Sequence, residues 1–299
     1  LLDRYRQSPR LFQLADRLSF SSPQHIALQN LQGSSAAFVI ASILQSDLCS
    51  QLNHVVVCED AEAAAYLQNS LENITGALEL YYFPASFKNR KNFRLLNSSH
   101  VMLRTEALTR WAAGGNRKLM VTYGEALFEK VVVPEALSAS VIHLKAGDQL
   151  DLNQLMEKMV GYGFERTDFV YEPGQFALRG GILDIYSFGN DKPYRVELFG
   201  NDIDSIRIVD PETQLSERKL LQVSIIPNVE TQFDDARKIS LLEFLPANTV
   251  IWLADPALLR EQLLTQEEDL HLFLQIQADH REAPHQEEER REKQRVLET

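Results

Sequence analysis

The chain has 299 residues, of which 44% are hydrophobic and 24% are charged. This composition is typical of a globular protein, and the length predicts roughly two domains. The net charge of −12 argues against the whole chain being a nucleic-acid clamp, because binding phosphates requires clustered positive surface.

The first 134 residues alternate between helical and strand patterns. Residues 1–22 show helical spacing of leucines and predict one helix. Three apolar runs predict strands, and each lies next to a helical segment. Apolar strands that alternate with helices favour a parallel α/β sheet covered on both faces. The expected strands are 54–58, 78–83 and 118–122, and the expected helices are 61–71, 106–113 and one that begins at Tyr123.

A Gly-Ser turn precedes the apolar helix that begins near Phe38. It contains Gly33, Ser34, Ser35 and Ala36. A turn of this kind before a helix is the shape of a loop that cradles phosphates. A working loop requires Gly-Lys-Ser/Thr, because the lysine neutralises phosphate and the hydroxyl holds Mg²⁺. Neither group stands at the required place, so a tight turn that starts a helix is the favoured interpretation, and a nucleotide site is the alternative.

One basic and aromatic cluster interrupts this region. It consists of Lys88, Arg90, Lys91 and Arg94, with Phe87 and Phe93 between them. Such a mixture is able to bind nucleic acid or an acidic partner. A solvated loop explains it equally simply and is the favoured interpretation.

The pattern changes after Pro134. A strand at 141–144 and an amphipathic helix at 151–162 precede a long run of short β segments from Tyr171 to Gln214, separated by turn residues such as Gly180-Gly181 and Gly200-Asn201. This spacing predicts an antiparallel meander. Within 175–179, alternation predicts that Phe176 and Leu178 face the core while Gln175, Ala177 and Arg179 face outward.

The remaining segments predict a return to the first sheet. A strand at 223–227, a helix near 235–244 and an apolar strand at 249–253 follow the meander. Residues 255–299 are helical and polar, interrupted at Ala283-Pro284, with a charge run at 287–293 that indicates a solvated helix. The chain therefore divides into 1–134, the first part of an α/β domain; 135–217, an inserted α+β domain; and 218–299, the second part with charged helices.

Cysteine usage and hydropathy indicate a cytoplasmic protein. Cys49 and Cys58 lack metal or redox spacing, which suggests buried thiols in a reducing compartment. No apolar run approaches the ~20 residues of a membrane span, and no signal-peptide pattern is present. Because the chain lacks an initiator Met and stops in a charged helix, we expect it to be an excised fragment.

Residues 174–185, 193–200 and 203–206 closely resemble the N-terminal module of the bacterial transcription-repair coupling factor family, Mfd, and more loosely the excision-repair protein UvrB. The match is highly specific over 141–227, moderate over 28–134 and weak over the final helices. UvrB differs because it has an intact Gly-Lys-Thr loop and a tyrosine-rich hairpin, which Tyr81 to Phe87 is too short to form.

The resemblance implies a degenerate helicase-like parallel α/β domain with an inserted small α+β domain that contains an antiparallel meander. It also implies that the small domain binds the damage sensor UvrA. In the family, RNA polymerase, DNA, ATP and Mg²⁺ are bound by parts of the full-length protein that 299 residues cannot hold. The fragment is therefore expected to be non-catalytic, with no cofactor and no metal, to recruit UvrA for nucleotide excision repair and to restrain the parent translocase.

The resemblance carries UvrA-binding positions onto two residues, and two aromatic residues between them are further candidates. Arg166 and Arg179 match the outer two of three family arginines, whereas the middle one falls on Ala177. Phe169 and Tyr171 lie between them and are candidate aromatic anchors, since arginine and aromatic residues dominate interface energetics. Core packing under the meander is the alternative for both aromatic side chains.

Two other classes of function compete with this interpretation. One is a nucleotide-binding domain that uses the loop at Gly33–Ala36, which the absence of the lysine argues against. The other is a DNA-binding module that uses Lys88 to Arg94, which the net charge argues against.

Overall fold

The computed structural model describes residues 1–20, 22–76, 79–89, 92–231, 233 and 235–297. Two helices open the chain, α1 (Leu2–Arg6) and α2 (Pro9–Leu18), where the sequence predicted one. The single helix was wrong because Pro9 cannot donate a backbone hydrogen bond inside a helix, whereas it fits the first turn of a new one.

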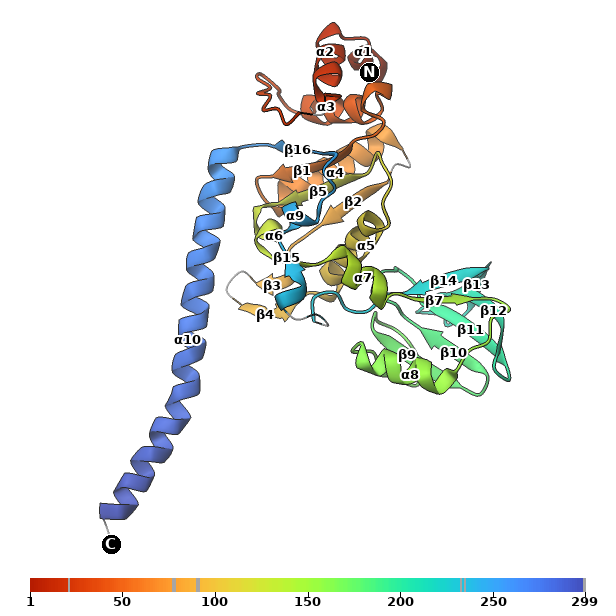
Figure 1. The fold of residues 1–299 in the computed structure, drawn as a ribbon, viewed down its shortest axis with the longest axis vertical. Helices are drawn as coiled ribbons and strands as arrows, with labels where there is room; N and C mark the ends of the chain where they lie inside the picture. The colour runs from red at the N-terminus through yellow and green to blue at the C-terminus, as the bar shows by residue number, and fades with distance from the viewer. Residues whose placement is uncertain (21, 77–78, 90–91, 232, 234, 298–299) are drawn as a thin grey trace.

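A four-stranded parallel sheet forms the centre of the larger domain (Figure 1). Its strand order is β16-β1-β5-β2, and every pair is parallel. The strands are β1 (Asn53–Cys58), β2 (Leu80–Phe83), β5 (Leu119–Tyr123) and β16 (Thr249–Leu253). Because β16 pairs with β1 across almost two hundred residues, the chain does return to its first sheet, as the sequence predicted.

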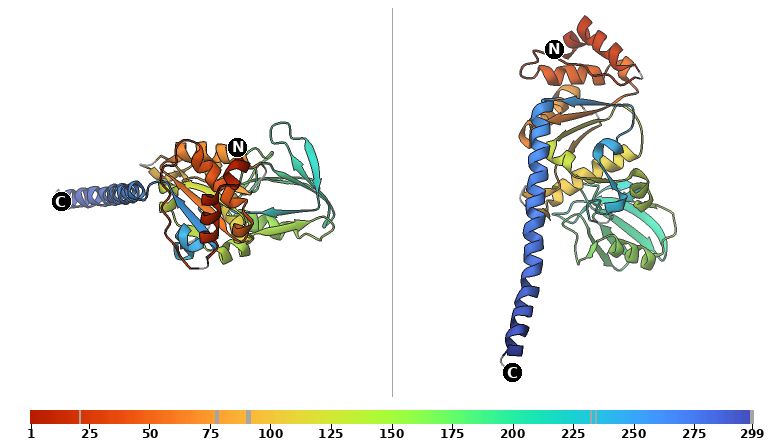
Figure 2. Two further views of the ribbon diagram at one scale, coloured as in Figure 1. Left: turned by 90° about the horizontal axis from the view of Figure 1, so that it is seen from above. Right: turned by 60° about the vertical axis from the view of Figure 1, so that its left-hand side comes forward.

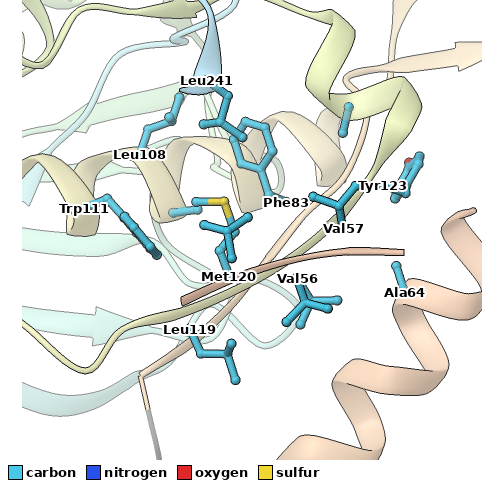
Figure 3. Packing of buried hydrophobic residues seen from close by; sticks show 14 of the residues in the cluster. Val56, Val57, Ala64, Phe83, Leu108, Trp111, Leu119, Met120, Tyr123 and Leu241 are labelled. Carbon is cyan, nitrogen blue, oxygen red and sulfur yellow. The ribbon is translucent and has the colours of Figure 1, made fainter. Parts of the chain in front are cut away.

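Helices pack around this sheet and close its core. Figure 3 shows Phe83, Leu108 and Met120 meeting between the sheet and α5, and Leu241 contributes from the returning segment. The helices and short elements are α3 (Ser35–Leu44), η1 (Asp47–Cys49), α4 (Ala61–Thr75), β3 (Phe87–Asn89), β4 (Asn92–Leu96), α5 (Ser98–Ala112), α6 (Gly124–Phe128), β6 (Val131–Val132) and α7 (Pro134–Ser140).

The smaller domain is a curled sheet packed on one helix. The meander is confirmed: a six-stranded sheet has the order β13-β12-β11-β10-β9-β8, antiparallel except between β8 and β9. Met159 of α8 packs with Phe176, Leu183 and Val196 in its core. The elements are β7 (Ile142–Lys145), α8 (Leu152–Gly161), β8 (Glu165–Arg166), β9 (Gln175–Arg179), β10 (Ile182–Ile185), β11 (Tyr194–Phe199), β12 (Asp202–Val209), β13 (Ser216–Leu220) and β14 (Gln222–Ile225).

The C-terminal part differs from its prediction in two places. The segment expected as a helix at 235–244 contains η2 (Asp235–Arg237), β15 (Lys238–Ile239) and α9 (Leu241–Phe244), because Lys238 and Ile239 pair with β6. The interruption expected at Pro284 was also wrong. Helix α10 (Pro256–Leu297) continues through it, since one proline removes a single hydrogen bond from a run of strong helix formers.

Helix α10 extends away from the rest of the molecule after its first turns, as Figure 1 and both views of Figure 2 show. Its first turns lie against the larger domain, where the Gln262 amide donates to the backbone oxygen of Glu59 (2.7 Å). Among the described helices, none combines the length and the hydropathy needed to cross a membrane.

Candidate partner-binding surface

The four candidate residues lie along one edge of the smaller domain. Arg166 is on the edge strand β8, whose two residues are exposed. Phe169 and Tyr171 follow in the loop between β8 and β9 and are 45% and 57% exposed. Arg179 ends β9, the neighbouring strand. The exposure of both aromatic side chains argues against the alternative that they are core residues.

The loop from Thr167 to Pro173 is held by hydrogen bonds to β9, to the β12–β13 connection and within itself. The Gln175 side-chain oxygen accepts from the backbone N–H groups of Tyr171 (2.8 Å) and Glu172 (3.1 Å). The Gln214 amide donates to the Val170 oxygen (3.0 Å), and the Thr167 hydroxyl donates to the Phe169 oxygen (2.8 Å). These bonds fix the backbone that carries Phe169 and Tyr171, so little order has to be gained when a partner binds.

The end of the loop depends on Gly174. Its φ is +88°, and a Cβ atom there would lie 2.3 Å from the Phe188 ring. Glycine is therefore required both for the backbone conformation and for the close approach.

Arg179 is held on two sides. Its Nη2 donates to Asp184 Oδ2 (2.5 Å), and its Nη1 donates to the backbone oxygen of Asp168. The guanidinium carbon lies 4.5 Å from the centroid of the Phe169 ring, which is cation–π distance. The side chain remains 33% exposed. Arg179 is thus a partly exposed arginine whose plane is fixed between an aromatic ring and a carboxylate.

The prediction that Ala177 faces outward was wrong. Ala177 is fully buried and packs with Val170 and Tyr186, because the loop after β8 covers this part of the second sheet face. The position of the missing family arginine is consequently occupied by a small core side chain. Phe176 is buried as predicted, and Leu178 packs against the core of the smaller domain.

The turn at Gly33–Ala36 opens α3, with Ser34 as its N-cap residue. Gly33 has a φ of +55°, and no side-chain cap bond is present at Ser34. The segment is therefore a turn that starts a helix, as the favoured interpretation predicted. The basic and aromatic cluster lies largely outside the described residues: Arg90 and Lys91 are not described, nor are the side chains of 88–95.

A buried ion network fills the region beyond the carboxyl ends of β2 and β5, where open α/β sheets commonly bind ligands. Arg104 is fully buried over the Phe83 ring and donates to Glu230 (2.5 Å). Its Nη1 lies 3.6 Å from a Glu129 oxygen. Burial raises the pKa of Glu129 although Arg104 opposes it. Burial alone would lower the pKa of Arg104, but the carboxylates of Glu230 and Glu129 raise it.

Within the ranges that the structure describes, no group of three or more His, Cys, Asp or Glu side chains is placed to hold a metal ion.

Known proteins resemble both the smaller domain and much of the rest of the chain. Residues 142–230 match the family model described as the UvrB interaction domain. A transcription-repair-coupling factor of Staphylococcus haemolyticus is 29% identical over 226 residues, which is 75% of this chain and 19% of that protein. The corresponding factor of Myxococcus xanthus is 29% identical over 71% of the chain, and that of Bacillus subtilis is 32% identical over 43%. The chain thus spans about a fifth of the length of the curated relatives it matches.

Residues 142–230 thus match the UvrB interaction domain in sequence, and this segment lies between parts of a parallel α/β domain. The resemblance to the N-terminal module of the bacterial transcription-repair coupling factor is thereby confirmed. The matched region begins at β7 and includes β14.

Sequence reasoning missed two residues of this surface, Asp184 and Arg195. Asp184 was one polar residue in the run Ile-Leu-Asp-Ile, and a carboxylate in the middle of an apolar strand is a signal that it needs a buried partner. Arg195 stands opposite it in register on β11.

Proposed function

We propose that this chain is a non-catalytic protein-interaction module of a transcription-repair coupling factor, and that it recruits UvrA through Arg166, Phe169, Tyr171 and Arg179. The match of 142–230 to the UvrB interaction domain is the observation that carries this proposal. The module works in the bacterial cytoplasm in transcription-coupled nucleotide excision repair. It also restrains the DNA translocase of the parent protein, which binds RNA polymerase and DNA through other parts.

The chemistry of the edge supports this assignment. Two arginines and two exposed aromatic side chains stand within one loop and two adjacent strands. Arginine and large aromatic residues are the usual hot spots of protein interfaces. The loop is already ordered by hydrogen bonds to Gln175 and Gln214, so a partner meets a preformed surface.

The direct experiment is capture of purified UvrA by the immobilised 299-residue chain at moderate salt. We expect retention of UvrA, and a weaker signal when Phe169 is replaced by Ala. Phe199→Ala is the matched control, because Phe199 is an exposed aromatic residue at the end of β11, two strands away from β9 in the sheet. Failure of the chain to retain UvrA at any salt concentration would refute the proposed partner.

The absence of a nucleotide cofactor belongs to the same proposal. Ala36 stands where a nucleotide loop has its lysine, and the region beyond β2 and β5 is filled by Arg104 and its carboxylate partners. Isothermal titration with Mg-ATP should therefore show no tight binding. A micromolar dissociation constant would favour the alternative of a nucleotide-binding UvrB-like domain. Weak binding of sulfate or phosphate would not, because helix N-termini attract anions in general.

A further inference from the structure

Asp184 lies directly behind the candidate surface, where it is fully buried and bonded to Arg179. It is on β10, in register with Ala177 on one side and Arg195 on the other. Its neighbours in sequence, Leu183 and Ile185, point into the core of the smaller domain, so Asp184 points to the opposite sheet face. A buried carboxylate is costly unless it is paired and hydrogen-bonded.

Two arginines supply that pairing in different ways. Arg195 donates from Nε to Oδ1 (2.8 Å) and from Nη2 to Oδ2 (2.9 Å), which is a bidentate contact. Its side chain is only 15% exposed, and the bond to Asp184 raises its pKa. Arg179 shares Oδ2 through Nη2 (2.5 Å) and is 33% exposed. Arg195 therefore anchors the carboxylate, and the carboxylate in turn holds the more exposed arginine.

The consequence for Arg179 is a fixed orientation with donors left over. A guanidinium has five N–H groups. Two of these are used, one by Asp184 and one by the Asp168 oxygen, and the Phe169 ring covers one face of the plane. Three N–H groups have no hydrogen-bond partner among the residues that the structure describes and are available to a binding partner, on a side chain that does not need to be ordered when binding occurs.

We propose that Asp184 is a positioning residue of the interface: anchored by Arg195, its buried carboxylate aims the Arg179 guanidinium at carboxylate groups of the partner. This inference rests on the proposed function, because it assumes that Arg179 contacts UvrA. The Arg195–Asp184–Arg179 group carries one net positive charge, so an acidic contact on the partner is the complementary chemistry.

The test is a double-mutant cycle on UvrA affinity with the full 299-residue chain. Asp184→Asn keeps the shape of the side chain but removes the charge that holds Arg179. We expect it to weaken UvrA binding by about tenfold in the parent and by less than about twofold in an Arg179→Ala background. Asp204→Asn is the control, since it removes an exposed carboxylate from β12. Equal losses in both backgrounds, or no loss in the parent, would overturn the proposal.

A second measurement depends neither on UvrA nor on the stability of Asp184→Asn. Nitrogen-15 spectra of the unmodified chain should show Arg179 guanidinium protons that exchange slowly and rotate slowly about the Nε–Cζ bond, with the signal assigned by its loss in Arg179→Lys. An averaged, rapidly exchanging signal would overturn the positioning role. If the signal is fixed but UvrA does not bind the unmodified chain, the proposed function fails and the positioning role of Asp184 stands as a property of the fold.

Discussion

At the scale of single residues, the two arginines that bond Asp184 have different roles in our proposal. Arg195 stabilises the fold, and Arg179 contacts the partner. The sequence predicted that Arg179 faces outward, and removal of an ordinary surface residue costs under ~0.5 kcal/mol. The structure shows a direct bond from Arg179 to a buried carboxylate, so we expect a cost of about 1 kcal/mol. The larger structural role falls to Arg195, which is less exposed.

Replacing Arg195 by Gln should destabilise the chain by about 2–3 kcal/mol, because Asp184 loses its bidentate partner and keeps only Arg179. Urea denaturation of Arg195→Gln and Arg179→Ala in parallel measures the difference. Arg218→Gln on the exposed strand β13 is the control and should change stability little. Equal stability losses for Arg195→Gln and Arg179→Ala would contradict this division.

The burial of His54 in the parallel sheet makes the free energy of unfolding depend on pH. It is fully buried on β1, its Nδ1 accepts from Trp252 Nε1 (3.1 Å), and burial lowers its pKa to about 4. The unfolded chain binds its proton near pH 6.5, so the unfolded state holds more protons between pH 6.5 and pH 4. Stability contributed by neutral His54 is therefore present above about pH 6.5 and is lost as the pH falls through that window.

Between pH 7.5 and pH 5, this residue should account for a loss of about 2 kcal/mol in the free energy of unfolding. Denaturant titrations at the two pH values test this in the parent and in His54→Gln, where the difference should shrink by that amount. His143→Gln changes an exposed histidine and should leave the difference as in the parent. An unchanged pH dependence in His54→Gln would show that another group is responsible.

At the scale of elements, turn residues and alternation predicted the meander and the core side of β9. What they did not predict follows from contacts distant in sequence. Ala177 is buried only because the loop around Val170 packs over it, and β15 forms only because β6 is available to pair with it. Local patterns carry no information about such coverings. Local patterns did indicate that Asp184 is unusual, because a carboxylate in the middle of an apolar strand requires a buried partner.

Gly174 ends the loop that carries Phe169 and Tyr171, so the conformation of the candidate surface depends on it. Gly174→Ala should destabilise by about 3 kcal/mol, since the new Cβ would meet the Phe188 ring and the φ of +88° disfavours any side chain. Gly200→Ala is the matched control. Its φ is +62° and nothing lies within 4 Å of the added atom, so about 1 kcal/mol is expected. Thermal melts compare the two, and a smaller loss for Gly174→Ala would contradict the close approach.

At the scale of the whole molecule, the smaller domain is connected to the larger one by its two ends. β14 pairs with β7, and Val223 and Ile225 pack in the core of the smaller domain. The division expected at residue 217 leaves β14 outside the inserted domain, whereas residues 142–230 include both β7 and β14. Glu230, at the end of this segment, accepts a hydrogen bond from Arg104 in the larger domain.

The edge of the smaller domain that carries the candidate residues is exposed, and we propose it as the partner surface. The central claim is that this edge binds UvrA through an oriented Arg179. The calorimetric dissociation constant of UvrA should rise by more than about 20-fold for Arg179→Ala, equivalent to about 2 kcal/mol, and by less for Arg179→Lys, which retains the charge without the planar fork.

Arg218→Ala is the control in that titration, because it removes one positive charge from the opposite edge strand of the same sheet. The account predicts an affinity within about twofold of the parent for Arg218→Ala and a loss of more than about 20-fold for Arg179→Ala, with both variants melting cooperatively. A folded Arg179→Ala that binds UvrA as tightly as the parent would contradict the account.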